Sequence, residues 1–454
     1  MLKGCERAEP TISVLRSGRA EEHAQEGRRL LLSRDFGLVW WSQMISQVGD
    51  GVTKLALLWF VYAITGSPLK TTVIGLLQTL PPILFGVLIG VGVDRLPKKW
   101  IMIGSDVLRA ILIGVIPCLT SVEAFTVERL YVLVFLHAVA SACFGPALTA
   151  SVPFLVSRAR YTAANALLQS TTSLGVIIGP GLSGLGIALL SSQEVLCLNA
   201  VTYLGSAACL LPIRLTPVED RRPAGSAVEW VVRDLIEGIQ FALVRQPRIL
   251  LLIIAASLYT FGTSAFSTLF PVFGRKLLDL GPVEVGYLWS AMGVGLLLVS
   301  IGLVSVTEWE LRHRFVILAM SNAVSGVALW GLLWLRDQWG VALLMGLIGI
   351  GLGVMTPVAW AILQEISPAH VVGRALAVYN TAAMATAVAG MSVFGWITQR
   401  LDERAAVAGI AMVMLATALL VGTLTRWVRV RSADRAPARY PGLVKEGGQA
   451  GKVT

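Results

Sequence analysis

Long apolar segments recur along almost the whole chain, and short polar connections separate most of them. A run of about 20 apolar residues is long enough to cross a bilayer as a helix. The chain contains twelve such segments, which cover residues 36–65, 71–93, 100–119, 130–156, 162–190, 195–213, 249–274, 284–306, 315–335, 339–363, 374–398 and 405–427. The sequence therefore predicts an all-helical membrane protein with twelve transmembrane helices.

The composition leads to the same fold class. Hydrophobic residues make up 55% of the 454 residues, and charged residues only 14%, whereas soluble proteins have about 25% charged residues. The net charge of +10 does not indicate nucleic-acid binding, because basic residues in loops and tails orient membrane proteins. The five cysteines lack CxxC or metal-ligand spacing, so we expect no disulfide framework, metal site or cofactor.

The apolar segments form two sets of six. The division predicts an N-terminal tail (1–35), a six-helix bundle (36–213), a linker (214–248), a second six-helix bundle (249–427) and a C-terminal tail (428–454). The tail 1–35 is charged throughout, so we expect no cleavable signal peptide there. Apolar residues at helical spacing over 228–243 predict a helix along the membrane surface.

The distribution of basic residues predicts the orientation. If both termini are cytoplasmic, 28 of the 37 Lys and Arg residues lie on the cytoplasmic side, seven lie outside and two lie within spans. Cytoplasmic loops of membrane proteins carry an excess of Lys and Arg. We therefore expect an even number of spans, both termini in the cytoplasm and a location in the inner (plasma) membrane.

A charged hairpin connects the second and third apolar segments. Gly90 and Gly92 would allow two helices to approach closely. Asp94 lies at the membrane edge, where a carboxylate needs a partner or a helix N-terminus. Three basic residues would keep the hairpin in the cytoplasm: Arg95, Lys98 and Lys99.

Asp50 and Lys54 are charged residues near the centre of the first span. A charge at the bilayer centre costs at least about 2.5–3.5 kcal/mol, and the four-residue spacing puts both side chains on one helical face. They should face a central cavity or each other. In one hypothesis Asp50 exchanges a proton while Lys54 tunes its pKa or contacts substrate. In the other, the two residues form a static ion pair.

The third span holds a second pair, Asp106 and Arg109. Arg109 lies nine residues beyond Trp100, roughly 13 Å along a helix, which is too deep for easy snorkelling. A partner such as Asp106 is therefore expected, and we favour a structural pair over a transport role. His137 in the fourth span could relay protons, although a buried, hydrogen-bonded histidine is the simpler interpretation.

The fifth span is rich in glycine around Pro180. Gly175 and Gly179 share one helical face, and Gly181 and Gly184 lie on roughly the opposite face. Small residues on two faces allow close packing against two neighbours, and the proline removes a backbone hydrogen bond, so a bend is expected. Plain tight packing and a conformational role both fit this pattern.

Together these features resemble the major facilitator superfamily of secondary transporters. The six-plus-six layout with a long basic linker is typical of that family. The hairpin resembles its signature between spans two and three at Gly90, Asp94, Arg95, Lys98 and Lys99, with Pro97 where glycine is more usual. Residues 175–184 resemble its antiporter signature, which the family associates with export.

Weaker similarities point to the macrolide and siderophore efflux branch. They lie at 49–50, 106–109, 164–167, 364–368 and 373–374. The resemblance implies a monomeric exporter of a small amphipathic molecule that works by proton antiport with alternating access. In contrast to many proton-coupled members, residues 130–156 contain no arginine. An importer or lipid flippase of the same fold, or a non-transporting receptor, remains an alternative.

The resemblance also implies a partner for the hairpin. If the two halves are pseudo-symmetric, Asp94 should approach Arg374 at the start of the eleventh span in the outward-open state. These hairpin residues would then act as a conformational latch, or would only fix the topology. The chain has no P-loop, HExxH or GxSxG pattern, so we expect neither an enzyme nor a self-contained ATP-driven pump.

Overall fold

The described part of the chain is helical. The computed structural model describes residues 30, 33–121, 126–215, 247–303, 311–367 and 372–433. All long elements in these residues are α-helices, which confirms the all-helical prediction for them. The helix predicted over 228–243 lies outside the described residues, as do most of both tails.

Each predicted apolar segment overlaps one long helix. The helices before the linker are α2 (Arg34–Thr65), α3 (Pro68–Arg95), α4 (Lys98–Ser121), α5 (Val127–Leu155), α6 (Tyr161–Leu189) and α7 (Ser192–Leu210), with a short 3-10 turn, η1 (Arg158–Arg160), before α6. The helices after it are α9 (Pro247–Leu277), α10 (Pro282–Leu303), α11 (Leu311–Gly331), α12 (Gln338–Ile366), α13 (Val372–Arg400) and α14 (Glu403–Ala433).

Ten of the helices in the described residues are long and apolar enough to cross a membrane. The chain is therefore a multi-pass membrane protein. Helices α3 and α7 are not among these ten, so the count of twelve crossings stays a prediction.

The connection between α2 and α3 shows how local sequence sets the helix boundaries. Gly66 adopts a left-handed conformation (φ 60°) that ends α2, as glycine commonly does at a helix C-terminus. The side chain of Ser67 accepts a hydrogen bond from the backbone N–H of Lys70 at 3.3 Å, and Pro68 begins α3. Serine caps and first-turn prolines both favour a helix start. The chain therefore reverses direction within a few residues.

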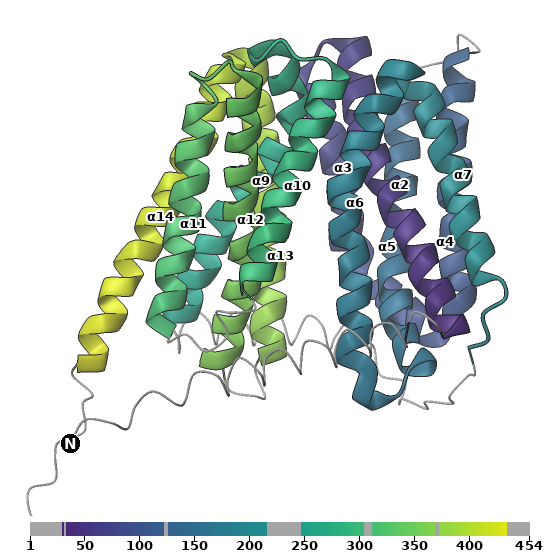
Figure 1. Ribbon diagram of the computed structural model, residues 1–454, viewed down its shortest axis with the longest axis horizontal. Helices are drawn as coiled ribbons and strands as arrows, with labels where there is room; N and C mark the ends of the chain where they lie inside the picture. Colours follow the sequence, from purple (N-terminus) through teal and green to yellow (C-terminus); the bar gives the residue numbers. More distant parts are fainter. Residues whose placement is uncertain are drawn as a thin grey trace, which may run out of the picture.

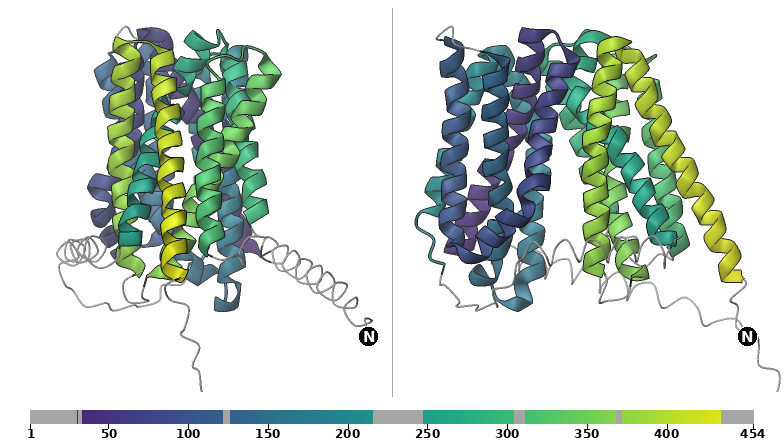
Figure 2. Two further views of the ribbon diagram at one scale, coloured as in Figure 1. Left: turned by 90° about the vertical axis from the view of Figure 1, so that its left-hand side faces the viewer. Right: turned by 180° about the vertical axis from the view of Figure 1, so that it is seen from behind.

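The helices pack into a first helix group (α2–α7) and a second helix group (α9–α14). In the first group, α2 packs on α6 and α7, α4 on α5 and α7, and α3 on α5. In the second, α9 packs on α13 and α14, α10 on α12, and α11 on α12 and α14. The two groups lie side by side (Figure 1 and Figure 2).

The two groups meet at one end of the molecule and separate toward the other (Figure 1). We call these the Thr65 end and the Arg34 end, after the two ends of α2. The principal contacts between the groups are α6 with α10 and α3 with α13. At the Thr65 end, the Ser67 hydroxyl donates to Gln399 Oε1 at 2.8 Å.

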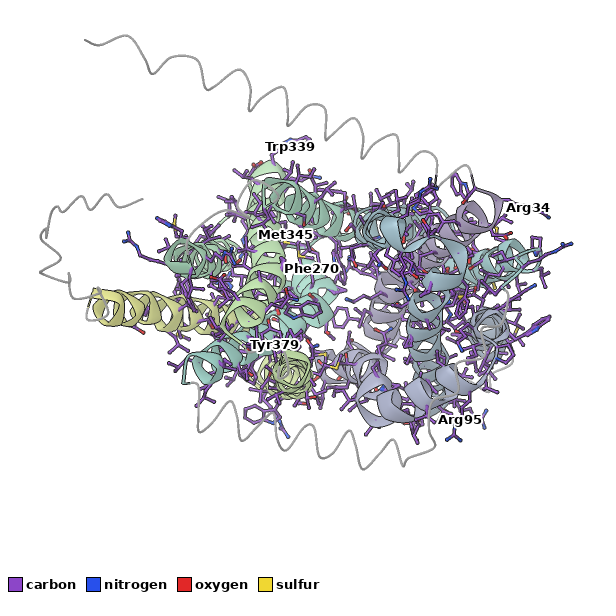
Figure 3. The ribbon with its side chains drawn as sticks, turned by 90° about the horizontal axis from the view of Figure 1, so that it is seen from below. Arg34, Arg95, Phe270, Trp339, Met345 and Tyr379 are labelled. Carbon is purple, nitrogen blue, oxygen red and sulfur yellow. The ribbon has the colours of Figure 1, made fainter. Side chains whose placement is uncertain are left out.

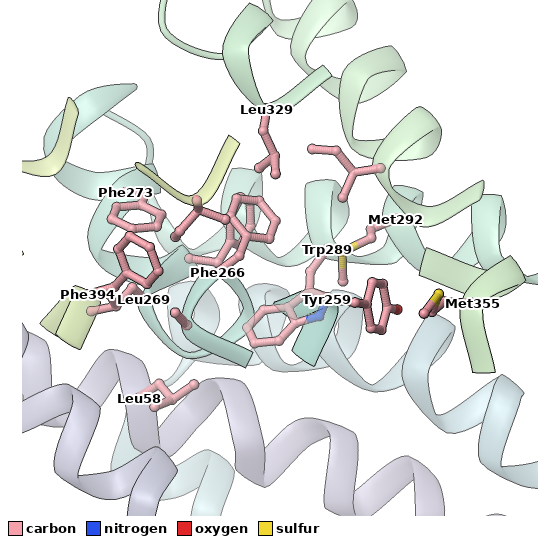
Figure 4. Close-up of a cluster of buried hydrophobic side chains, with 14 of the residues drawn as sticks. Leu58, Tyr259, Phe266, Leu269, Phe273, Trp289, Met292, Leu329, Met355 and Phe394 are labelled. Atoms are coloured by element: carbon pink, nitrogen blue, oxygen red, sulfur yellow. The ribbon is translucent and has the colours of Figure 1, made fainter. Parts of the chain in front are cut away.

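Two apolar cores reflect this shape. The larger contains residues of both groups, including Leu58 of α2 with Phe266 and Leu269 of α9, all at most 2% exposed; Figure 4 shows these side chains. The smaller lies in the first group and includes Phe36 and Val93. Apolar burial therefore joins the two groups at the Thr65 end.

Candidate functional site

The centre of the first helix group holds an ion pair between α2 and α4. Arg109 Nη1 lies 3.2 Å from Asp50 Oδ1 and 3.4 Å from Asp50 Oδ2. The Arg109 side chain is only 2% exposed, whereas that of Asp50 is 32% exposed. The carboxylate is thus the accessible member of the pair, and the guanidinium is the buried one.

Arg109 also forms an ion pair with a second carboxylate. Its Nη2 atom contacts Asp106 Oδ1 and lies 3.0 Å from the Ser46 hydroxyl. The side chain of Asp106 is fully buried. A planar guanidinium can bridge two acceptors in this way. When all three groups are ionised, this cluster of Asp50, Asp106 and Arg109 carries a net charge of −1.

Two aromatic side chains extend the network from Asp50. The Tyr203 hydroxyl of α7 donates to Asp50 Oδ1 at 2.6 Å, and His137 Nε2 of α5 lies 3.2 Å from the same hydroxyl. The Arg109 guanidinium carbon also lies 4.5 Å from the Tyr203 ring centroid and 4.9 Å from that of Phe144. His137 is thus buried and adjoins Asp50 only through Tyr203.

Serines of α2 and α7 hold the other end of the cluster. The Ser206 hydroxyl donates to Asp106 Oδ2 at 2.6 Å and lies 2.8 Å from that of Ser42. The sequence predictions missed these serines and Tyr203. The serines of α2 could have been found from the sequence. Polar residues recur there every four positions and so line one face of the helix: Ser42, Ser46, Asp50 and Lys54.

Lys54 does not pair with Asp50. Its Nζ atom lies 5.5 Å from the ring centroid of Trp289 in α10, so the side chain reaches from the first group to the second. The Lys54 side chain is accessible to solvent. The two residues were expected to face either a central cavity or each other. In this structure they do not form a direct ion pair with each other.

The glycine-rich segment of α6 packs against two neighbours. A Cβ at Gly175 would lie 2.6 Å from the Gln47 carbonyl oxygen of α2, and one at Gly179 would lie 2.6 Å from Gly51 Cα. On the opposite side, a Cβ at Gly184 would lie 3.0 Å from Gly286 Cα of α10, and one at Gly181 would lie 2.9 Å from Ser290 Oγ. One face thus packs within the first group, and the other packs against the second.

The hairpin lies at the Arg34 end, where the groups diverge. Among the described residues, no atom lies within 4 Å of a Cβ added at Gly90 or Gly92, so the close approach of two helices that these glycines would allow is not seen in this conformation. Lys99 donates instead to the Leu211 and Ile213 carbonyls, at 2.6 and 2.9 Å. These carbonyls follow α7, which ends at Leu210, and a lysine that binds carbonyls at a helix C-terminus stabilises that end.

The other residues of the predicted latch lie at or near helix ends. Arg95 ends α3 and Lys98 begins α4. The side chains of Asp94 and Arg374 lie outside the described residues, so the latch contact stays a prediction. No three His, Cys, Asp or Glu side chains in the described residues could together hold a metal ion.

Comparison with known proteins gives one family. The family model described as "Major Facilitator Superfamily" matches residues 39–391. The multidrug efflux pump Tap of Mycolicibacterium fortuitum is 26% identical over 410 residues, covering 88% of this chain and 97% of that protein. Macrolide efflux protein A of Streptococcus pyogenes is 26% identical over 345 residues, covering 75% of this chain and 83% of that protein.

Solved structures with the same fold are more distant in sequence. The nucleoside transporter NupG (D323A mutant) has a TM-score of 0.66 at 13% identity, covering 87% of this chain and 99% of that chain. An inward-facing bacterial homologue of the human lysosomal transporter Spinster has a TM-score of 0.63 at 13% identity, covering 89% and 100%. At this identity the likeness shows the fold alone.

Proposed function

The chain belongs to the Major Facilitator Superfamily, and on that premise we propose that it exports a small amphipathic molecule by alternating access, in exchange for protons. Membership supports a transporter rather than an enzyme. The direction of transport rests on its relatives, whose names describe multidrug and macrolide efflux. The substrate would be of the same general class, and no cofactor is required.

The proposal includes a topology. All twelve long helices cross the plasma membrane as two six-helix bundles, 36–213 and 249–427, which the linker 214–248 joins. Both termini are cytoplasmic, and the tails comprise residues 1–35 and 428–454. The Arg34 end then faces the cytoplasm. The bias of Lys and Arg toward this end supports the orientation, and the protein acts as a monomer.

The observation that carries proton exchange is the excess of acid over base around Arg109. Two carboxylates share one guanidinium, so one proton makes the cluster neutral. Asp50 is the carboxylate that a proton can reach, because Asp106 is fully buried. Intramembrane acids of this kind mark ion pathways in transporters. Asp50 would thus bind and release the proton, while Asp106 keeps Arg109 paired in both states.

The contacts between the groups support alternating access. The groups join at the Thr65 end through α6 with α10 and α3 with α13, and they diverge at the Arg34 end (Figure 1). In the proposed topology this conformation is open to the cytoplasm. Rocking of one bundle against the other would expose the site to the outside. Asp94 would then approach Arg374 and latch the cytoplasmic end.

Transport into everted vesicles tests the proposal. Vesicles that contain the wild-type protein should accumulate a radiolabelled macrolide when their interior is acidified, and a protonophore should abolish the accumulation. Asp50→Asn should reduce it to the level of vesicles without the protein. Asp35→Asn, at the Arg34 end of the same helix, is the matched control and should transport normally.

Three results would contradict the proposal in different ways. Undiminished proton-driven accumulation by Asp50→Asn would remove Asp50 from the coupling role. Accumulation only in right-side-out vesicles would indicate an importer. Movement of labelled phospholipid between leaflets, with no macrolide transport, would indicate a flippase.

A further inference from the structure

Lys54 forms a contact between the two helix groups that the transport proposal does not use. Its Nζ atom lies 5.5 Å from the Trp289 ring centroid, within the range of a cation–π interaction. In the described part of the chain, no carboxylate lies within ion-pair distance of Lys54. Among the described residues, the Trp289 ring is therefore the group with which the Lys54 ammonium interacts.

The Trp289 ring is the fixed member of this contact. Trp289 is only 4% exposed, and it packs edge to face on Phe270 of α9 with ring centroids 5.8 Å apart. Phe270 lies on the side of the second group that faces the first (Figure 3). Ser290, the next residue of α10, lies against Gly181 of α6. Lys54 is exposed and has a long flexible side chain, so it is the member that can move.

Lys54 has a second possible partner on its own helix. Asp50 lies one turn earlier on the same face of α2, and opposite charges at this spacing attract. An ionised Asp50 leaves the cluster around Arg109 with a net negative charge, whereas a protonated Asp50 leaves it neutral. The electrostatic attraction of Lys54 toward this cluster therefore depends on whether Asp50 carries a proton.

We propose that Lys54 is a charge-controlled bridge that couples the protonation of Asp50 to the contact between the helix groups. With Asp50 protonated, Lys54 stays on Trp289 and the Thr65 end remains closed. With Asp50 ionised, Lys54 turns toward α2, and the Thr65 end is free to open. The inference rests on the proposed function, since it takes Asp50 as the proton site.

The direction of this coupling, with closure of the Thr65 end when Asp50 is protonated, agrees with proton exchange. A proton that binds from the outside would close the outside, and its release into the cytoplasm would loosen that closure so that loaded substrate can leave. If the contact instead formed when Asp50 is ionised, the Thr65 end would stay closed after the proton is released, and the substrate could not leave.

Other charged groups around α2 do not replace Lys54 in this role. Arg109 and Asp106 of α4 face Asp50 from one side, and Tyr203 of α7 separates it from His137 of α5. Helices α3, α6, α9 and α10 also pack against these elements, and α6 has no charged residue. The others carry theirs near the helix ends, at Lys70, Asp94, Arg95, Arg248, Arg275, Lys276 and Glu284.

The distance between the two groups at the Thr65 end tests the bridge. Spin labels at Glu128→Cys of α5 and Arg404→Cys of α14, in a full-length background without native cysteines, report this distance in lipid nanodiscs. No substrate and no proton gradient are present. A cation–π contact of ordinary strength should shift the ratio of closed to open populations by about 2- to 30-fold.

The bridge predicts a specific set of results. In the wild type, the closed population should rise as pH falls. Asp50→Asn should be closed at every pH. Lys54→Gln and Trp289→Leu should both be less closed and insensitive to pH. Lys54→Arg should keep the pH response, because arginine also binds aromatic faces. Lys70→Gln and Trp339→Leu, at the same end but outside the contact, should behave as wild type.

Two results would overturn the bridge. One is a wild-type pH response in Lys54→Gln, and the other is a pH response that survives in Asp50→Asn. Because the distances are measured without substrate, they are independent of vesicle transport. A protein that fails to export the macrolide but keeps the predicted distance changes would refute the proposed function and not the bridge.

Discussion

At the scale of single residues, Arg109 has the most consequential position. It is almost fully buried, yet it contacts Asp50, Asp106 and Ser46. A buried charge is tolerated only when hydrogen bonds and opposite charges compensate its lost hydration. Residues of three helices provide this compensation directly or through Tyr203 and Ser206. The cluster therefore binds α2, α4 and α7 together and leaves Asp50 partly exposed, as the proposed proton exchange requires.

Removal of Arg109 should destabilise the protein more than removal of its buried partner. Arg109→Ala leaves the buried Asp106 carboxylate without its cation, which costs about 3–5 kcal/mol. Asp106→Asn should cost less, because Arg109 keeps Asp50. Thermal unfolding of the purified variants in detergent measures both effects. The double variant Arg109→Gln, Asp106→Asn should recover part of the loss, and equal destabilisation by the two single changes would contradict this account.

At the scale of elements, α6 divides its glycines between two kinds of contact. Gly175 and Gly179 pack on α2 within the first helix group, whereas Gly181 and Gly184 pack on α10 of the second. The first contact persists if each group moves as a unit. The second must break when the Thr65 end opens. If the groups move in this way, tight packing and a conformational role, which the sequence leaves as alternatives, belong to different faces of one helix.

Valine at the two faces of α6 should therefore have different effects. Gly179→Val inserts a side chain against Gly51 and should lower stability by about 1–3 kcal/mol, as overpacking does. Gly184→Val should leave the first group folded but disfavour the contact with Gly286. Unfolding temperature measures the first effect, and the spin-label distance at the Thr65 end measures the second. A shift of conformation by Gly179→Val, without loss of stability, would argue against the division.

At the scale of the whole molecule, the two ends differ in what holds the groups together. The larger apolar core crosses between the groups, whereas the smaller one stays within the first. Burial of apolar surface therefore favours closure at the Thr65 end. Closure at the Arg34 end needs another contact, and the predicted hairpin latch would provide it through Asp94 and Arg374.

Asp94→Ala should bias the protein toward the conformation described here, which is open at the Arg34 end, because it weakens the latch of the opposite state. Labelling of single cysteines from the two sides of the membrane measures the bias. Reagents should reach the Arg34 end more readily and the Thr65 end less readily than in the wild type. Asp35→Ala removes a carboxylate at the same end and should not change labelling. Unchanged labelling in Asp94→Ala would count against the latch.

The sequence by itself determined the properties that depend on local spacing. Apolar run length predicted long helices, and the ten membrane-competent helices agree with it. The three-residue interval between Asp106 and Arg109 brings their side chains together on α4, and helical periodicity separated the two glycine faces of α6. These properties follow from the geometry of one helix, which the order of residues specifies directly.

Only the tertiary structure decided which helices face one another. Asp50 pairs with Arg109 of α4 rather than with Lys54, and Tyr203 of α7 completes its surroundings. Lys54 meets Trp289, which is remote in the sequence. Such partners depend on the rotation of each helix about its axis and on the packing of two groups. Helices that are apolar both on the face toward lipid and on the face toward neighbouring helices carry too little polar pattern to predict either.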